Sequence, residues 1–220
     1  MNRKQYVIAG ILTVMLMIPA ISSVAQISLG VDIANRYVWR GMDFGDSPSI
    51  QPELSYTSGG FEIGVWGALA TTGNPAGTEI SPYVSYTFGT DAGDFSVILT
   101  DYTFPGMGGE WPLEGDTHAL EVGLAYDGIF SLFAGVFVYG DDDNSVYVEL
   151  GYEFDEIGVF LGFSPLESDE YGTDGFGIIN VGLAYEKELK ITDDFSLGLQ
   201  SALILNPTSE SLFLVFGIGF

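Results

Sequence analysis

The sequence has no cysteine, only six lysines and arginines, and no long apolar run beyond its first residues. Without cysteine the chain can form neither disulfides nor a cysteine-linked lipid anchor. Beside 30 acidic residues and a formal net charge of −24, so few basic residues cannot neutralise the phosphates of a nucleic acid. Apolar residues still make up 47% of the chain and aromatic residues 14%, which argues against a disordered acidic protein.

The start of the chain has the pattern of a secretory signal peptide. Arg3 and Lys4 precede an apolar run that is too short to span a membrane comfortably, and small residues ending at Ala25 offer a cleavage site. We therefore expect residues 1–25 to be a signal peptide and residues 26–220 to form one outer-membrane domain.

The remainder of the chain consists of short segments in which apolar residues alternate with polar or small ones. A tilted strand needs only about ten residues to cross a membrane, whereas a helix needs about 20. The pattern predicts twelve strands, at residues 28–39, 49–57, 60–70, 79–88, 94–104, 117–126, 129–139, 145–154, 157–164, 177–186, 194–204 and 211–220. We expect an all-β, antiparallel up-and-down transmembrane barrel with short periplasmic turns and longer external loops.

The last segment, residues 211–220, has one apolar face and one face of mostly small residues, and it ends on an aromatic residue. In a soluble protein such a strand would leave a sticky edge, whereas in a membrane barrel it is paired and meets lipid. It resembles the C-terminal strand of bacterial outer-membrane barrels, which implies recognition by the barrel assembly machinery.

Aromatic residues recur at the ends of alternate predicted strands. Each of these strands ends on an aliphatic residue, a small residue and an aromatic one, the aromatics being Tyr56, Tyr86, Tyr126, Tyr152, Tyr185 and Phe220. Such a ring is typical of a membrane interface and favours lipid contact over a soluble β-sandwich. We expect Tyr37 and Trp39 in the opposite ring.

The inward parity carries seven acids and one base, which are Asp32, Arg36, Glu53, Glu62, Glu79, Glu121, Glu149 and Glu153. If Trp39 pairs with Ile50, Arg36 lies opposite Glu53, where a guanidinium can grip a carboxylate with two hydrogen bonds. Two roles remain open for this pair: a charged constriction that selects solutes, or an ion pair that satisfies buried charges in a filled lumen.

Two aromatic residues also fall on the inward parity. Trp66 faces Tyr83 if Leu69 pairs with Ile80. They either fill space in the lumen or stack on a solute, and the sequence leaves both roles open.

Five motifs in the first half of the chain are Tyr37-Val-Trp-Arg-Gly41, Gln51-Pro52, Gly64-Val-Trp-Gly67, Tyr83-Val-Ser-Tyr86 and Asp101-Tyr-Thr-Phe-Pro-Gly106. Together they resemble the TorF-type porin family of bacterial outer membranes. The second half matches only by its strand pattern. The resemblance implies a small monomeric barrel that passes solutes, and it adds a class of protein rather than a mechanism.

We therefore expect a passive channel for small solutes in the lipid bilayer of the bacterial outer membrane, without a cofactor. It should prefer cations when open, because inward acids outnumber inward bases. The alternatives are a closed structural or adhesive barrel and, with less support, a barrel hydrolase. A hydrolase needs a base beside its nucleophile, and the single histidine, His118, cannot be tied to a serine by pattern. The run Asp141-Asp-Asp-Asn144 lacks the spacing of an EF-hand and fits a solvated loop better than a calcium site.

Overall fold

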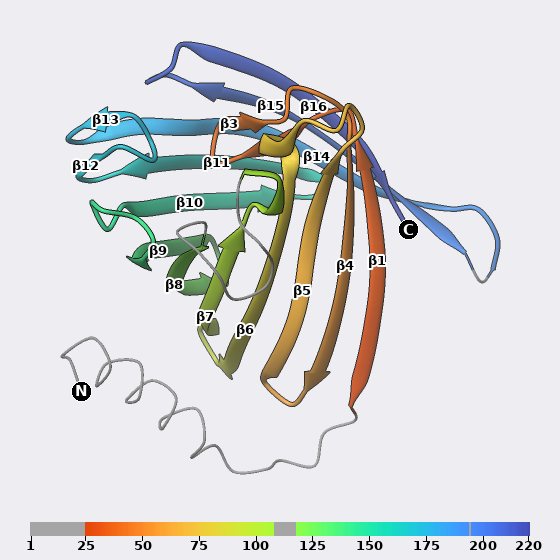
Figure 1. Cartoon of the computed structure of the whole chain (residues 1–220). Coiled ribbons are helices and arrows are strands. Elements are labelled where there is room, and N and C mark those ends of the chain that lie inside the picture. The colour runs from red at the N-terminus through yellow and green to blue at the C-terminus, as the bar shows by residue number, and fades with distance from the viewer. Residues whose placement is uncertain (1–24, 108–117, 194) are drawn as a thin grey trace.

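The computed structural model describes residues 25–107, 118–193 and 195–220. Within them twelve strands form one closed antiparallel barrel, and neighbours in the wall follow one another along the chain (Figure 1). The wall strands are β1 (Gln26–Ala34), β4 (Ser49–Ser58), β5 (Phe61–Ala70), β6 (Thr78–Thr90), β7 (Gly93–Thr103), β8 (His118–Asp127), β9 (Ser131–Tyr139), β10 (Val146–Phe154), β11 (Ile157–Ser164), β14 (Gly177–Lys190), β15 (Ser196–Asn206) and β16 (Ser211–Gly219). The predicted up-and-down barrel is confirmed, whereas residues 1–24 of the predicted signal peptide lie outside the described ranges.

Two short hairpins and two 3₁₀ helices lie between the wall strands. They are β2 (Tyr37–Trp39) with β3 (Met42–Phe44), β12 (Glu167–Ser168) with β13 (Thr173–Asp174), η1 (Pro75–Gly77) and η2 (Pro105–Met107). No helix in the described part of the chain is long and apolar enough to cross a membrane.

Alternation along the wall strands sends apolar side chains to the outside of the barrel. Five leucines from five strands expose between 48% and 77% of their surface, and they are Leu29, Leu54, Leu124, Leu183 and Leu214. Water would disfavour an apolar belt of this extent, and contact with lipid would remove that cost.

Aromatic side chains contact one another from strand to strand near the short turns. The rings of Phe95 and Tyr126 are 5.0 Å apart, and those of Tyr126 and Phe130 are 5.2 Å apart. Phe195 and Phe220 form a similar stacked pair at 6.5 Å. These contacts place several of the expected aromatic residues together, and their position at a membrane interface stays a prediction.

The first predicted strand is wrong in its second half, because the chain leaves the wall after Ala34. Residues 35–48 enter the barrel as a segment that we call the inner hairpin, which contains β2 and β3. The wall resumes at Ser49, directly opposite Ala34. As a result Glu53 lies opposite Gly30, and the predicted pairing of Arg36 with Glu53 is wrong.

The inner hairpin also corrects the predicted outer ring of Tyr37 and Trp39. Tyr37 is buried in the lumen and donates a hydrogen bond to Glu79 at 2.8 Å. The ring of Trp39 lies 5.3 Å from that of Tyr102, an inward residue of β7. The side chains of Tyr37 and Trp39 therefore pack inside the barrel and do not form an outer ring.

A second register differs from the prediction by two residues. Leu69 pairs with Thr78 rather than Ile80, because η1 returns the chain to the wall sooner than expected. Trp66 and Tyr83 are therefore not cross-strand partners. Since the shift is an even number, both side chains still face the lumen.

The barrel closes through a short seam between β1 and β16, whose register has three pairs that end at Ala34 opposite Gly217. The side-chain amide of the next residue, Asn35, lengthens the seam. Its Nδ2 donates to the Leu214 carbonyl at 3.0 Å, and its Oδ1 accepts from the Phe216 backbone N–H at 2.9 Å. Asn35 thus replaces a peptide group that β1 would have supplied had it stayed in the wall.

Candidate functional site

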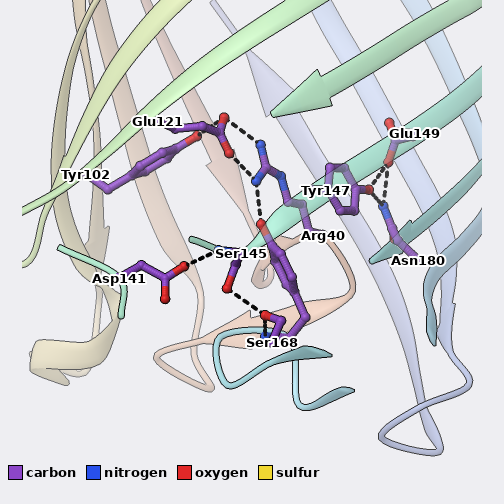
Figure 2. Close-up of polar contacts among 10 residues, drawn as sticks. Arg40, Tyr102, Glu121, Asp141, Ser145, Tyr147, Glu149, Ser168 and Asn180 are labelled. Carbon is purple, nitrogen blue, oxygen red and sulfur yellow. Dashed lines mark hydrogen bonds and ion pairs between the residues drawn. The ribbon is translucent and has the colours of Figure 1, made fainter. Parts of the chain in front are cut away.

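Arg40, at the tip of the inner hairpin, is the centre of the polar network in the lumen (Figure 2). Its Nη1 and Nη2 donate to the two carboxylate oxygens of Glu121 on β8, at 2.5 and 2.9 Å. Nη1 also donates to the Tyr171 hydroxyl at 2.6 Å. Only 8% of the Arg40 side chain and 3% of the Glu121 side chain are exposed, so the ion pair is buried.

Aromatic rings complete the surroundings of this guanidinium. Its central carbon lies 4.3 Å from the ring centroid of Trp39, 4.4 Å from that of Tyr147 and 5.2 Å from that of Phe133. Burial alone would lower the pKa of Arg40, but the Glu121 carboxylate raises it above its usual value, so the group keeps its charge. Ring faces and a two-pronged carboxylate are the groups that bind a guanidinium best.

Backbone geometry fixes the tip of the inner hairpin. Arg40 and Gly41 both have positive φ, 50° and 78°, as a two-residue hairpin turn of type I′ requires. A Cβ on Gly41 would collide with the carbonyl of Ile179. Asn206 on β15 donates to the Gly41 carbonyl at 3.1 Å. A non-glycine residue in this conformation is held by its surroundings, which is common at functional sites.

The loop between β11 and β14, residues 165–176, delivers Tyr171 to this network. The hydroxyl of Ser168 lies 2.7 Å from that of Ser145 and accepts from the Tyr171 backbone N–H at 3.0 Å. The backbone N–H of Asp169 donates to Asp143 at 2.9 Å. Contacts with the loop that follows β9 therefore hold this loop over the end of the barrel.

Two hollows lie on either side of the layer that Trp39 and Tyr102 form. The first, of about 840 Å³, which we call the outer hollow, is lined by both rings and by acids of two loops, which are Asp141, Asp142, Asp143, Asp169 and Glu170. The second, of about 510 Å³, which we call the lumen hollow, is lined by the same two rings and by Arg40, Glu121 and Glu149. A layer of side chains therefore separates two acidic spaces.

Glycines on the inward parity let large side chains lie flat against the wall. A Cβ on Gly64 would come within 2.6 Å of the Tyr83 ring, and one on Gly123 within 2.7 Å of the Phe133 ring. Gly135 leaves the same kind of room for the Glu121 carboxylate, at 2.6 Å. Side chains that cross the neighbouring strand in this way lie along the wall rather than project from it.

The expected inward acids Glu53 and Glu62 meet at Tyr83. Its hydroxyl lies 2.6 Å from Glu53 and 3.0 Å from Glu62, having crossed above Gly64. A phenol has one proton, so it can donate to only one carboxylate at a time. At any moment, therefore, one of the two carboxylates does not receive the hydrogen bond of this hydroxyl.

The remaining expected lumen residues have other partners. Glu79 accepts from Ser81 at 2.5 Å as well as from Tyr37, whose ring lies 5.2 Å from that of Trp66. Glu149 accepts from Asn180 at 2.8 Å and from the Tyr147 hydroxyl. These contacts agree with the inward direction predicted for Glu79 and Glu149, whereas their partners are not evident from the alternation of residues.

Three further residues lie away from Arg40. Arg36 pairs with Asp43 and Asp46 within the inner hairpin. Asp32 lines a separate hollow of about 460 Å³, together with Glu186 and Glu188. Glu153 is exposed.

His118 has an acidic partner near the start of β8. Its Nδ1 lies 3.0 Å from the Asp101 carboxylate. Among the described residues no serine hydroxyl is hydrogen-bonded to it, and no group of three or more acids, histidines or cysteines there could hold a metal ion.

Sequence reasoning missed Arg40, Tyr102, Tyr147, Tyr171 and Asn180 as parts of the site. Arg40 lies within the motif that runs from Tyr37 to Gly41, and this motif indicates a resemblance but not the position of the side chain. An Arg-Gly pair between apolar residues is a weak signal for a type I′ turn, which favours asparagine or aspartate before glycine.

A family model, Gcw_chp, described as a bacterial protein of unknown function, matches residues 20–164, more than half of the chain. No curated protein matches. The match does not extend to TorF-type porins, which stay a resemblance of motifs. The chain belongs to the Gcw_chp family of bacterial proteins of unknown function.

Proposed function

We propose that this protein is a channel of the bacterial outer membrane that passes small cationic solutes, as its likeness to TorF-type porins implied. The observation that carries the proposal is the pair of acidic hollows inside a closed barrel, separated by the layer of Trp39 and Tyr102. An apolar outer surface suits a lipid bilayer, and a polar interior suits passage of solutes.

The charge of the interior supports cations rather than anions as the solute. The outer hollow has five loop acids in its lining, and its described lining residues include one histidine, His118, and no lysine or arginine. In the lumen hollow the single basic residue, Arg40, is matched by Glu121, which leaves Glu149 as excess negative charge. Walls of low dielectric constant focus such a potential and raise the local concentration of cations.

Recording from the purified mature chain in planar bilayers tests the proposal. We expect discrete current steps and a reversal potential of the cation-selective sign under a salt gradient. Heat-modifiable migration on gels shows whether the protein is a folded barrel. A folded barrel that inserts into the bilayer but carries no current would contradict the proposal.

A second candidate is a closed structural or adhesive barrel, and the inner hairpin favours it. The buried Arg40–Glu121 pair and the Tyr171 contact join this hairpin to the wall and to the loop between β11 and β14. The two candidates differ when the hairpin is removed, because a channel then conducts more and a barrel that is filled elsewhere stays silent. A hydrolase has less support, since His118 is paired with Asp101 and, among the described residues, no serine hydroxyl is hydrogen-bonded to it.

A further inference from the structure

The groups around Arg40 form a complete binding site for a guanidinium ion. Glu121 offers two parallel hydrogen bonds, and the Tyr171 hydroxyl accepts a third at 2.6 Å. Trp39 and Tyr147 place their rings within 4.4 Å of the charge. Trp39 and Arg40 belong to the inner hairpin, whereas the other three residues belong to the wall and the outer loop.

The site borders empty space on the side of the lumen. The lumen hollow of about 510 Å³ is lined by Arg40 itself and by Glu121, Tyr147 and Glu149. Glu149 is held by Asn180 and Tyr147, neither of which carries a positive charge. The hollow therefore contains two carboxylates and one basic side chain, so its electrostatics accommodate one further cation.

The backbone that carries Arg40 into this site is strained. Its backbone has φ of 50°, a conformation that costs energy for a residue with a side chain. Elsewhere on the tip, Asn206 donates to the Gly41 carbonyl, and the Ile179 carbonyl lies where a Cβ on Gly41 would be. Withdrawal of the hairpin would therefore leave the carboxylate, the Tyr147 and Phe133 rings and the Tyr171 hydroxyl in place.

We propose that this site recognises solutes that carry a guanidinium group, and that Arg40 occupies it in the closed state as a tethered copy of such a solute. A solute drawn into the acidic outer hollow takes the place of Arg40 when the hairpin moves aside. The proposal names the class of solute for the channel and rests on the proposed function for the entry route. The binding site itself stands independently of conduction.

Chemical rescue of Arg40→Ala tests the binding site without any current measurement. The variant leaves Glu121 buried without its cation, and free guanidinium in the millimolar range, well below denaturing concentrations, should refill the site. We expect the midpoint of heat-modifiable unfolding in detergent to rise saturably, by about 5 °C or more. Sodium chloride at the same concentration controls for ionic strength. Urea at the same concentration controls for a molecule of similar shape that carries no charge.

Two further variants make the result specific. Arg36→Ala removes an arginine of the same hairpin that has no two-pronged carboxylate: Asp43 and Asp46 each offer it one oxygen, and its ring contact, Phe213, lies 5.7 Å away. Guanidinium should therefore rescue this variant much less. Arg40→Ala with Glu121→Gln lacks the carboxylate, and it should lose the response as well. A response of the same size in either variant, or with sodium, would overturn the proposal.

Folding failure does not remove the test. If Arg40→Ala refolds poorly, its refolding yield is compared with and without guanidinium. A yield restored by guanidinium and not by urea supports the site, and a yield that stays low with guanidinium counts against it. A protein that binds guanidinium but carries no current would instead leave the site intact and contradict the channel.

Discussion

At the scale of single residues, space on the inner surface is made by glycines that let large side chains lie along the wall. The clearest case is Gly64 beneath Tyr83, where the ring crosses β5 and its hydroxyl reaches Glu53 on β4. A projecting ring would instead occupy the lumen. The width of the lumen therefore depends on small residues as much as on the polar ones that a channel is expected to have.

Substitution of Gly64 by alanine tests this arrangement. The added Cβ would lie 2.6 Å from the Tyr83 ring, too close for an ordinary contact, so the ring must move and its hydrogen bond to Glu53 must weaken. We expect Gly64→Ala to lower the free energy of unfolding by about 1–3 kcal/mol. Urea unfolding followed by tryptophan fluorescence measures the change.

A matched control for that substitution is Gly158→Ala, also on the inward face. A Cβ there would meet its nearest neighbour, Ala184, at 3.7 Å, an ordinary van der Waals distance. Its free energy of unfolding should stay close to that of the wild type. Equal losses in the two variants would show that glycine matters here only through the backbone.

The direction of most wall side chains is predictable from sequence, because alternation with period two fixes the face once the apolar side is known. Alternation accordingly places Glu53, Glu79 and Glu121 inward. Their partners were not predictable, because Tyr83 reaches Glu53 across an intervening strand and Arg40 reaches Glu121 from 81 residues away. Such contacts depend on side-chain length and strand register, which alternation does not report.

At the scale of elements, the chain departs from a plain up-and-down barrel at the inner hairpin. Twelve strands were correctly expected, but the apolar parity of residues 28–39 concealed the point where β1 leaves the wall at Ala34. Packing inside the lumen and contact with lipid outside both favour apolar residues. The apolar pattern at Tyr37 and Trp39 is therefore the same whether these side chains face the lumen or the lipid. Asn35 marks the exit, because its amide takes over the pairing with β16.

Removal of the inner hairpin should open the lumen. Ala34 and Ser49 are already direct partners, so residues 36–47 can be replaced by a short glycine-serine turn without a gap in the wall. The deletion also removes Trp39, which lines both hollows, and Arg40, which lines the lumen hollow. We expect single-channel conductance to increase several-fold, measured in planar bilayers with protein that still shows heat-modifiable migration.

Shortening the tip of the β14–β15 hairpin provides the control for that deletion. This tip extends beyond the edge of the barrel (Figure 1), and in the outer and lumen hollows none of the lining residues comes from it. Conductance should be unchanged by its loss. A hairpin-deleted barrel that folds and remains silent would favour the closed structural barrel.

At the scale of the whole molecule, charge is distributed very unevenly. Residues 26–220 contain four basic side chains, which are Arg36, Arg40, Lys187 and Lys190. Each one forms an ion pair with a nearby carboxylate. The excess acids are therefore left without basic partners, and those of the outer hollow lie at the expected external mouth of the path.

Cation preference should consequently depend on the loop acids of the outer hollow. Replacing Asp141, Asp142 and Asp143 together by asparagine keeps oxygen acceptors for the turn, in which Asp141 accepts from the backbone N–H of Ser145 at 2.7 Å, but removes three charges. We expect the reversal potential under a potassium chloride gradient to move toward zero.

The preference should also weaken as salt rises, since screening acts over ~8 Å at physiological ionic strength. The same number of charges can be removed from exposed turns at the other end of the barrel, at Asp91, Asp127 and Asp155. Those turns are separated from the outer hollow by the height of a membrane barrel, about 25 Å, so the shift should be much smaller. Equal shifts from the two ends, or a wild-type pore that prefers anions, would show that the acidic hollow does not set the selectivity.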